Sequence, residues 1–138
     1  MAYRSYSIVD IEGIGKANAK KLAKANIKTT GALLRECATK KGRAAVAATS
    51  RIDEKRILKW TNLADLMRVK GVATQFSELL EAAGVDTIKE LRTRRPDNLA
   101  AAMAKANKKK KLARVTPSET VIKGWIAHAK KLANVIKY

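Results

Sequence analysis

Residues 9–22, VDIEGIGKANAKKL, contain the most informative pattern in the chain. An apolar residue and an acid lead into Gly13-Ile14-Gly15, after which the sequence becomes basic and helical in its spacing. Glycine leaves its amide group unshielded, and the start of a helix adds free N–H groups and the positive end of the helix dipole. The pattern predicts a glycine turn at the start of a helix, either as a simple connection or as a site for an anion such as phosphate.

The same pattern returns 58 positions later, where Ile11-Glu12-Gly13-Ile14-Gly15 aligns with Val69-Lys70-Gly71-Val72-Ala73. A second block aligns after a shift of 65 and places Glu54, Ile57, Trp60 and Ala64 on Glu119, Ile122, Trp125 and Ala129. The longer shift implies an insertion of seven residues, which we place in the basic stretch 105–111. We therefore expect one compact domain, 1–138, built from internal repeats 8–66 and 67–138.

Local signals are helical throughout the chain, and no segment has a convincing strand pattern. We expect helices over residues 16–25, 30–37, 53–67 and 96–107, with Asn26 and Gly84 as left-handed C-caps, Thr29 or Thr30 as an N-cap and Pro96 in a first turn. Thr116-Pro117-Ser118-Glu119 indicates a capping box with Thr116 as N-cap and proline at the first helical position. The apolar face of the helix that follows is expected to comprise Val121, Ile122, Trp125, Ile126, Ala129 and Leu132.

The composition of the chain favours a particular class of binding partner and a particular fold class. The chain has 138 residues, a net charge of +18 and an isoelectric point of about 10.3. Such a charge favours a polyanionic partner, which is DNA, RNA or an anionic membrane surface. Much of the apolar content is alanine, the best helix former, so the expected fold class is all-α: a compact bundle of short helices around a modest core.

The two glycine turns resemble the helix-hairpin-helix motif, an apolar-x-Gly-apolar-Gly turn followed at fixed spacing by an alanine and an apolar residue. Residues 11–22 match at every position, whereas residues 69–80 have Ala73 for the second glycine and Ser77 for the alanine. The segments IEGIGKANAKKLAKANIKTTGALL, KGRAAVAATSRIDEKRILKWTNLADLMRVKGV, LLEAAGVDTIKELRTRRPDNLAAAMAKAN and WIAHAKKL, taken in this order, resemble a mostly bacterial family of tandem helix-hairpin-helix proteins catalogued as a domain of unknown function. The resemblance implies a two-repeat helical fold and no known activity.

The candidate phosphate-binding residues form three groups. The turns contribute backbone amides from Gly13, Ile14 and Gly15 and from Gly71, Val72 and Ala73. Lys16, Lys20 and Lys70 contribute charge beside the turns. Further basic clusters are Lys40, Lys41 and Arg43, then Arg94 and Arg95 together with Arg92, and finally Lys108, Lys109, Lys110 and Lys111. Contacts to phosphates carry no base information, so binding is expected to be largely independent of sequence.

Each candidate also has a structural alternative. The glycine turns can be plain connections between helices, Arg43 can cap a neighbouring helix, and the four-lysine run can be a solvated loop. Trp60 and Trp125 lie on apolar helix faces and are expected in the core rather than as base-stacking platforms. A dinucleotide-binding glycine loop is excluded, because no strand precedes Gly13 and Asn18 stands where the third glycine belongs.

Several function classes have no support in the residues. One histidine and one cysteine, Cys37, argue against a metal site and exclude an internal disulfide, which suits a reducing compartment. No pair of acids is marked for acid–base catalysis, so we expect no enzyme and no cofactor. No stretch reaches the ~18 apolar residues of a membrane span, so we expect a cytoplasmic protein without a membrane partner.

The sequence therefore predicts a nucleic-acid-binding protein without strong sequence preference, with duplex DNA as the favoured partner. A nucleoid-associated, DNA-packaging or repair-accessory role fits this prediction. RNA binding, including association with the ribosome, is a close variant, because the phosphate chemistry is the same. The alternative of another class is an interaction scaffold, in which the hairpins are structural and the basic surface meets an acidic protein partner. The oligomeric state stays open.

Overall fold

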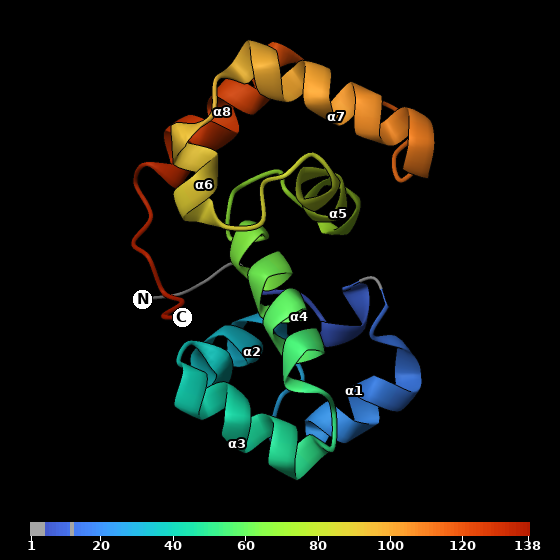
Figure 1. Ribbon diagram of the computed structural model, residues 1–138, viewed down its shortest axis with the longest axis vertical. Helices are drawn as coiled ribbons and strands as arrows, with labels where there is room; N and C mark the ends of the chain where they lie inside the picture. The colour runs from blue at the N-terminus through green and yellow to red at the C-terminus, as the bar shows by residue number, and fades with distance from the viewer. Residues whose placement is uncertain (1–4, 12) are drawn as a thin grey trace.

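Helices account for the regular structure of the chain, as the sequence predicts. The computed structural model describes residues 5–11 and 13–138, so Glu12 of the first glycine turn lies outside the described residues. Within these ranges there is no strand beyond an isolated bridge between Ser7 and Thr29. The elements are a short 3-10 helix η1 (Ile8–Asp10) and helices α1 (Gly15–Ala23), α2 (Thr30–Cys37), α3 (Lys40–Ser50), α4 (Glu54–Leu66), α5 (Thr74–Ala82), α6 (Ile88–Thr93), α7 (Pro96–Lys110) and α8 (Glu119–Ala129) (Figure 1).

The helices form two lobes that correspond to the two sequence repeats. The first lobe comprises η1, α1–α3 and most of α4, and the second comprises α5–α8; α4 stands between the two groups of helices (Figure 1). Each lobe has its own hydrophobic cluster; α4 contributes Leu63 to the first and Leu66 to the second, and its C-cap residue Met67 joins the first. Trp60 and Trp125 are each 3% exposed, one in each cluster, which confirms their predicted place in the core.

The predicted helix boundaries follow from local capping. Thr29 and Thr87, at equivalent places in the two repeats, each accept a hydrogen bond from the backbone N–H three residues ahead, at 3.1 and 3.2 Å. Asn26 and Gly84 both have a positive φ, 63° and 96°, which confirms their left-handed conformation, but they lie just beyond the C-cap residues of α1 and α5, which are Lys24 and Ala83. Pro96 occupies the first turn of α7, also as predicted.

The start of α8 differs from the predicted capping box. Ser118, not Thr116, is the N-cap, and its hydroxyl accepts a hydrogen bond from the Val121 N–H at 3.2 Å. Pro117 therefore precedes the helix, where its side chain is buried. Val121 is 46% exposed and Leu132 lies beyond the last residue of α8, so neither belongs to the buried apolar face of that helix.

The inserted residues lengthen α7 and the connection that follows it. Helix α7 has 15 residues against 11 in its counterpart α3, and it continues to Lys110. Lys108–Lys110 are thus the last helical turn, and the alternative of a solvated loop is wrong for them because lysine is a good helix former. Asn107 exchanges two hydrogen bonds with the backbone of Ala113, at 2.8 and 3.0 Å, and so holds the connection against the helix.

Residues 130–138, here called the return segment, run from α8 back to the first lobe (Figure 1). Arginine guanidinium groups hold its carbonyls: Arg68 donates to Ala133 at 2.8 Å, and Arg92 donates to Leu132. At the far end, the Lys137 N–H donates to the Ala38 carbonyl at 2.7 Å. No repeat or motif in the sequence predicts this connection between the lobes.

A buried ion pair stands where α4, α6 and the return segment meet. Arg68 donates to Asp65 Oδ1 from Nη2 at 2.8 Å, and the other carboxylate oxygen accepts from the Ile88 N–H at 3.2 Å. Burial raises the pKa of the Asp65 carboxyl, while the charge of Arg68 acts in the opposite direction. Because both side chains are almost fully buried, each charge depends on the other for its stability.

Candidate nucleic-acid interface

The first glycine turn alternates left-handed and right-handed backbone conformations from Gly13 to Gly15. The Ile14 N–H donates to the Ile11 carbonyl at 3.3 Å and closes the turn, and both isoleucine side chains are buried beneath it. Gly13 and Gly15 have φ values of +88° and +65°, on either side of a right-handed Ile14. Alternation of right- and left-handed residues turns successive N–H groups toward a common point, and both glycines are exposed there.

The helix that follows this turn adds to the same positive potential. Its N-cap residue is Ile14, which has no side-chain acceptor, so the first amide groups of α1 are not capped by a side chain. Lys16 and Lys20 are exposed on the first turns of α1, and the helix contains no acidic residue. The start of α1 therefore combines amide groups that the side chain of its N-cap residue does not cap, the positive end of the helix dipole and two lysines.

The second glycine turn is built alike but is less open. The Val72 N–H donates to the Val69 carbonyl at 3.0 Å, and Gly71 has a φ of +90°. Ala73, in the place of the second glycine, is extended, with a φ of −96°, so the alternation of hand stops after one residue. The Lys70 N–H donates to Nδ1 of His128 at 2.9 Å, and one amide of this turn is thereby already engaged.

The two turns also differ in the charge of the helices that follow them. Lys16 and Lys20 of α1 correspond to Thr74 and Glu78 of α5, so the second turn leads into a helix without a basic residue. His128 has no counterpart in the first repeat, because Leu63 occupies the equivalent position. The sequence prediction missed the role of His128, although comparison of the two repeats would have marked it as a polar residue that only the second copy has.

The two turns lie close to each other. The hydroxyl of Thr74, the residue after the second turn, donates to the carbonyl of Asp10, the residue before the first, at 2.5 Å. Gly13 and Gly71 are each three residues away from this bond. Because a residue spans at most ~3.6 Å, the two glycines lie within about 30 Å of each other. That separation is shorter than one helical turn of duplex DNA, about 34–36 Å.

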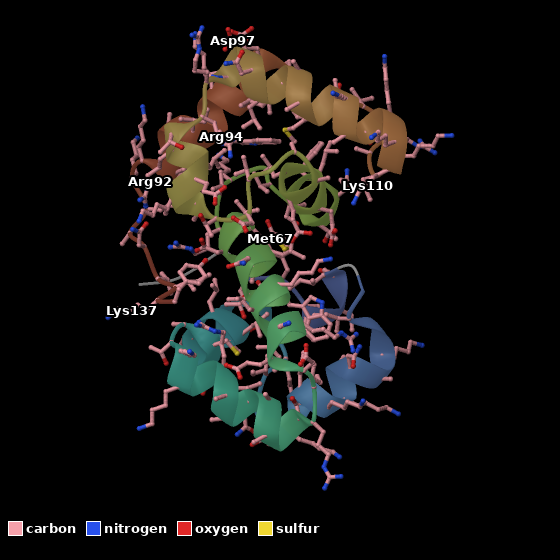
Figure 2. All side chains as sticks on the ribbon, in the orientation of Figure 1. Met67, Arg92, Arg94, Asp97, Lys110 and Lys137 are labelled. Carbon is pink, nitrogen blue, oxygen red and sulfur yellow. The ribbon has the colours of Figure 1, made fainter. Side chains whose placement is uncertain are left out.

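A groove lies between the first turn of α5 and the connection from α7 to α8. Its volume is about 440 Å³, and it is lined by Gln75, Phe76, Leu112, Ala113, Arg114 and Val115. The first turn of α5 thus faces the segment that follows the exposed run Lys108–Lys111. Lys110 lies on the opposite side of the molecule from Arg92 and Lys137 (Figure 2).

The remaining predicted basic residues are not part of this arrangement. Arg43 is 3% exposed and donates to the carbonyls of Cys37 and Ala38, at 3.0 and 3.3 Å, and to that of Lys137. It caps the end of α2 and holds the return segment, so its assignment to phosphate contact is wrong and the structural alternative is correct. At 3% exposure Arg43 offers little surface to an anion.

The other cationic residues at the helix junctions are partly engaged by the protein itself. Arg94 donates to the Gly84 carbonyl at 3.0 Å, and Arg95 forms an exposed ion pair with Asp97 at 3.1 Å. Lys40 and Lys41 are exposed at the start of α3, and Lys40 borders a cavity that Tyr138 of the return segment also lines. No contact in the described residues brings these four side chains to the glycine turns.

Comparison with known proteins identifies the family. The family model described as Domain of unknown function (DUF4332) matches residues 12–132, and the chain belongs to this family. Searches of the curated proteins and of the solved structures gave no match. Within residues 5–11 and 13–138 no three side chains of His, Cys, Asp or Glu are placed to share a metal ion. No helix in the described part of the chain is long and apolar enough to cross a membrane.

Proposed function

We propose that this chain, as a member of the DUF4332 family, binds nucleic acid without strong sequence preference, and that duplex DNA is its preferred target. The first glycine turn acts as a helix-hairpin-helix phosphate site. The observation that carries the proposal is the start of α1, where two left-handed glycines lead into a helix that its N-cap side chain does not cap and whose first turns carry the exposed Lys16 and Lys20. The net charge of +18 supplies attraction at longer range.

The chemistry is recognition of a phosphodiester by backbone amides. A phosphate oxygen accepts hydrogen bonds from N–H groups at Gly15 and Lys16, and the ammonium groups of Lys16 and Lys20 neutralise its charge. The second turn, with Lys70, Gly71, Val72 and Ala73, makes a weaker contact because His128 already accepts from one of its amides. Lys108–Lys111 add attraction that depends on salt but not on sequence.

A binding role in DNA packaging, in the nucleoid or as an accessory in repair follows from this chemistry, and we propose no catalytic activity. Structured RNA, including ribosomal RNA, presents the same phosphates and is the alternative target. A second candidate function is a protein-interaction scaffold. The hydrogen bond from the Lys70 N–H to Nδ1 of His128 supports this candidate, because it engages one amide of the second glycine turn within the protein.

The test is a salt titration with a matched pair of variants. Binding to a fluorescent 20-base-pair duplex is measured by anisotropy beside single-stranded DNA and an RNA hairpin. Each neutralised duplex phosphate contributes roughly −0.9 to the slope of log affinity against log salt, so a clamp over several phosphates gives about −4 or steeper. Lys16→Ala/Lys20→Ala is compared with Lys40→Ala/Lys41→Ala, which removes the same charge from the exposed start of another helix.

We expect the α1 pair to flatten the slope by roughly 1–2 and the α3 pair to leave it nearly unchanged. An equal effect of both pairs would mean that charge alone binds the probe, without the glycine turn. Tighter binding of the RNA hairpin than of the duplex would reassign the target to RNA. A slope near zero for all three probes would favour the protein scaffold.

A further inference from the structure

A groove lies between α5 and the connection from α7 to α8 in the described part of the molecule. It begins two residues after the second glycine turn and has a volume of about 440 Å³. This volume lies within the range of small-molecule sites, roughly 300–1,000 Å³. The groove therefore has room for a ligand group larger than a phosphate.

The charge of this groove distinguishes it from three other cavities. Those cavities each include carboxylates in their lining, from Asp65, from Asp53 and Glu54, or from Asp86 and Glu90. The groove has none, and its one charged lining residue is Arg114. Lys108–Lys111 come directly before it in the chain and are exposed. A neutral or anionic occupant fits these surroundings, and a cation does not.

The shape and polarity of the lining favour a flat aromatic occupant. The Phe76 ring packs against Trp125, with 5.4 Å between ring centroids, so the ring is held in position. Gln75 brings an amide that can both donate and accept, which is the side-chain chemistry that reads the edge of a base. Val115 is 75% exposed at the rim of the groove. Some DNA-binding proteins insert an exposed apolar side chain between stacked bases.

We propose that this groove accepts a single unpaired nucleobase, and that the protein prefers nucleic acid in which an unpaired nucleotide adjoins duplex. The inference rests on the proposed phosphate-binding function, because the two glycine turns hold the strand beside the groove. Only six aromatic residues exist in the chain, so the groove serves one base and not an extended single strand. An unpaired base enters at low cost, whereas a paired base must first break its pairing and leave the stack.

The experiment uses two 20-base-pair probes that differ at one place. One is continuous, and the other has a one-nucleotide bulge of 2-aminopurine at its centre. Stacking on an aromatic side chain is worth enough to predict roughly fivefold to tenfold tighter binding of the bulged probe. We also expect the 2-aminopurine fluorescence to change on binding, because the base moves from its stack onto Phe76.

Variants in the groove and a control elsewhere complete the test. Arg114→Ala/Val115→Ser changes two exposed side chains of the groove, and Arg35→Ala removes one exposed positive charge from α2. The groove variant should bring the affinity ratio of the two probes close to one while the control keeps the wild-type ratio. Circular dichroism checks that both variants are folded.

Two results overturn the proposal and are distinguishable. The first is salt-dependent binding of the continuous duplex together with an affinity ratio of the two probes that is near one or that the groove variant does not change. This result leaves the phosphate-binding function in place and refutes only the base-binding role of the groove. Absence of salt-dependent binding to both probes removes both proposals together.

Discussion

Replacing glycine by alanine should raise the free energy of unfolding at Gly124 and lower it at Gly15 and Gly71. Gly124 lies within α8, and a Cβ atom there meets nothing within 4 Å. Gly15 also has open space around it but a φ of +65°. Gly71 has a φ of +90°, and its Cβ would lie 3.1 Å from Nε1 of the buried Trp125. The three sites thus separate helix propensity, backbone strain and crowding.

The expected magnitudes follow from these three situations. Gly124→Ala should raise the free energy of unfolding by about 0.5–1 kcal/mol, since alanine favours the helix interior. Gly15→Ala should lower it by about 1–2 kcal/mol, which is the cost of a left-handed residue with a side chain. Gly71→Ala adds the crowding of Trp125 to that strain and should lower it by about 2–4 kcal/mol.

Guanidinium unfolding followed by tryptophan fluorescence measures all three values, and equal m-values would show that the same transition is compared. The reasoning fails if Gly124→Ala is the most harmful change or if the three variants agree within about 0.5 kcal/mol. On the proposed function, duplex binding by the folded Gly15→Ala protein weakens, while Gly124→Ala binds as the wild type does.

Two further predictions concern the buried polar groups. Asp65→Ala leaves the Arg68 guanidinium buried without its carboxylate and should lower the free energy of unfolding by about 3–5 kcal/mol. The double variant Asp65→Leu/Arg68→Met removes both charges and should lower it much less. Denaturant unfolding of both variants measures the two values, and equal losses would contradict the prediction. Burial raises the pKa of the Cys37 thiol from 9.0 to about 11, so its contribution to stability is present below pH 9 and is lost as the pH rises toward 11. The melting temperature of the wild type should therefore fall more steeply over that interval than that of Cys37→Ala, and parallel curves would contradict the burial effect; iodoacetamide at pH 8 should modify Cys37 only in the unfolded protein.

Local patterns in the sequence predict most of the helices. Thr29, Asn26 and Gly84 act through their immediate neighbours, so a single sequence is enough to place them. The repeat does the same for Trp60 and Trp125, because two copies of one pattern show which positions are buried. The glycine turns are likewise predictable, since positive φ values favour glycine in any fold.

Contacts between distant residues could not be predicted in this way. The guanidinium of Arg43 bonds a carbonyl 94 residues away, and that of Arg68 one 65 residues away. Carbonyl acceptors exist at every residue, so such pairs leave no pattern in composition or spacing. Arg43 therefore looked like part of a basic surface cluster, and only its burial distinguishes it.

For most of the run Lys108–Lys111, the sequence composition led to the wrong secondary structure. Its composition indicates a solvated loop, yet the intrinsic preference of lysine and the bonds of Asn107 extend the helix to Lys110. The start of α8 depended on a choice between two neighbouring hydroxyl residues, Thr116 and Ser118, which the capping pattern alone could not decide.

The return segment has a consequence for how this protein folds. In most tandem-repeat chains each unit contacts only its neighbour along the sequence, so units can unfold one after another from an end. Here residues that follow the last helix bond Ala38 and Asn62 in the first repeat. The bonds that complete the first repeat thus form only after almost the whole chain has been ordered, and contacts of such long range slow folding. Both repeats should accordingly gain and lose structure in a single cooperative transition.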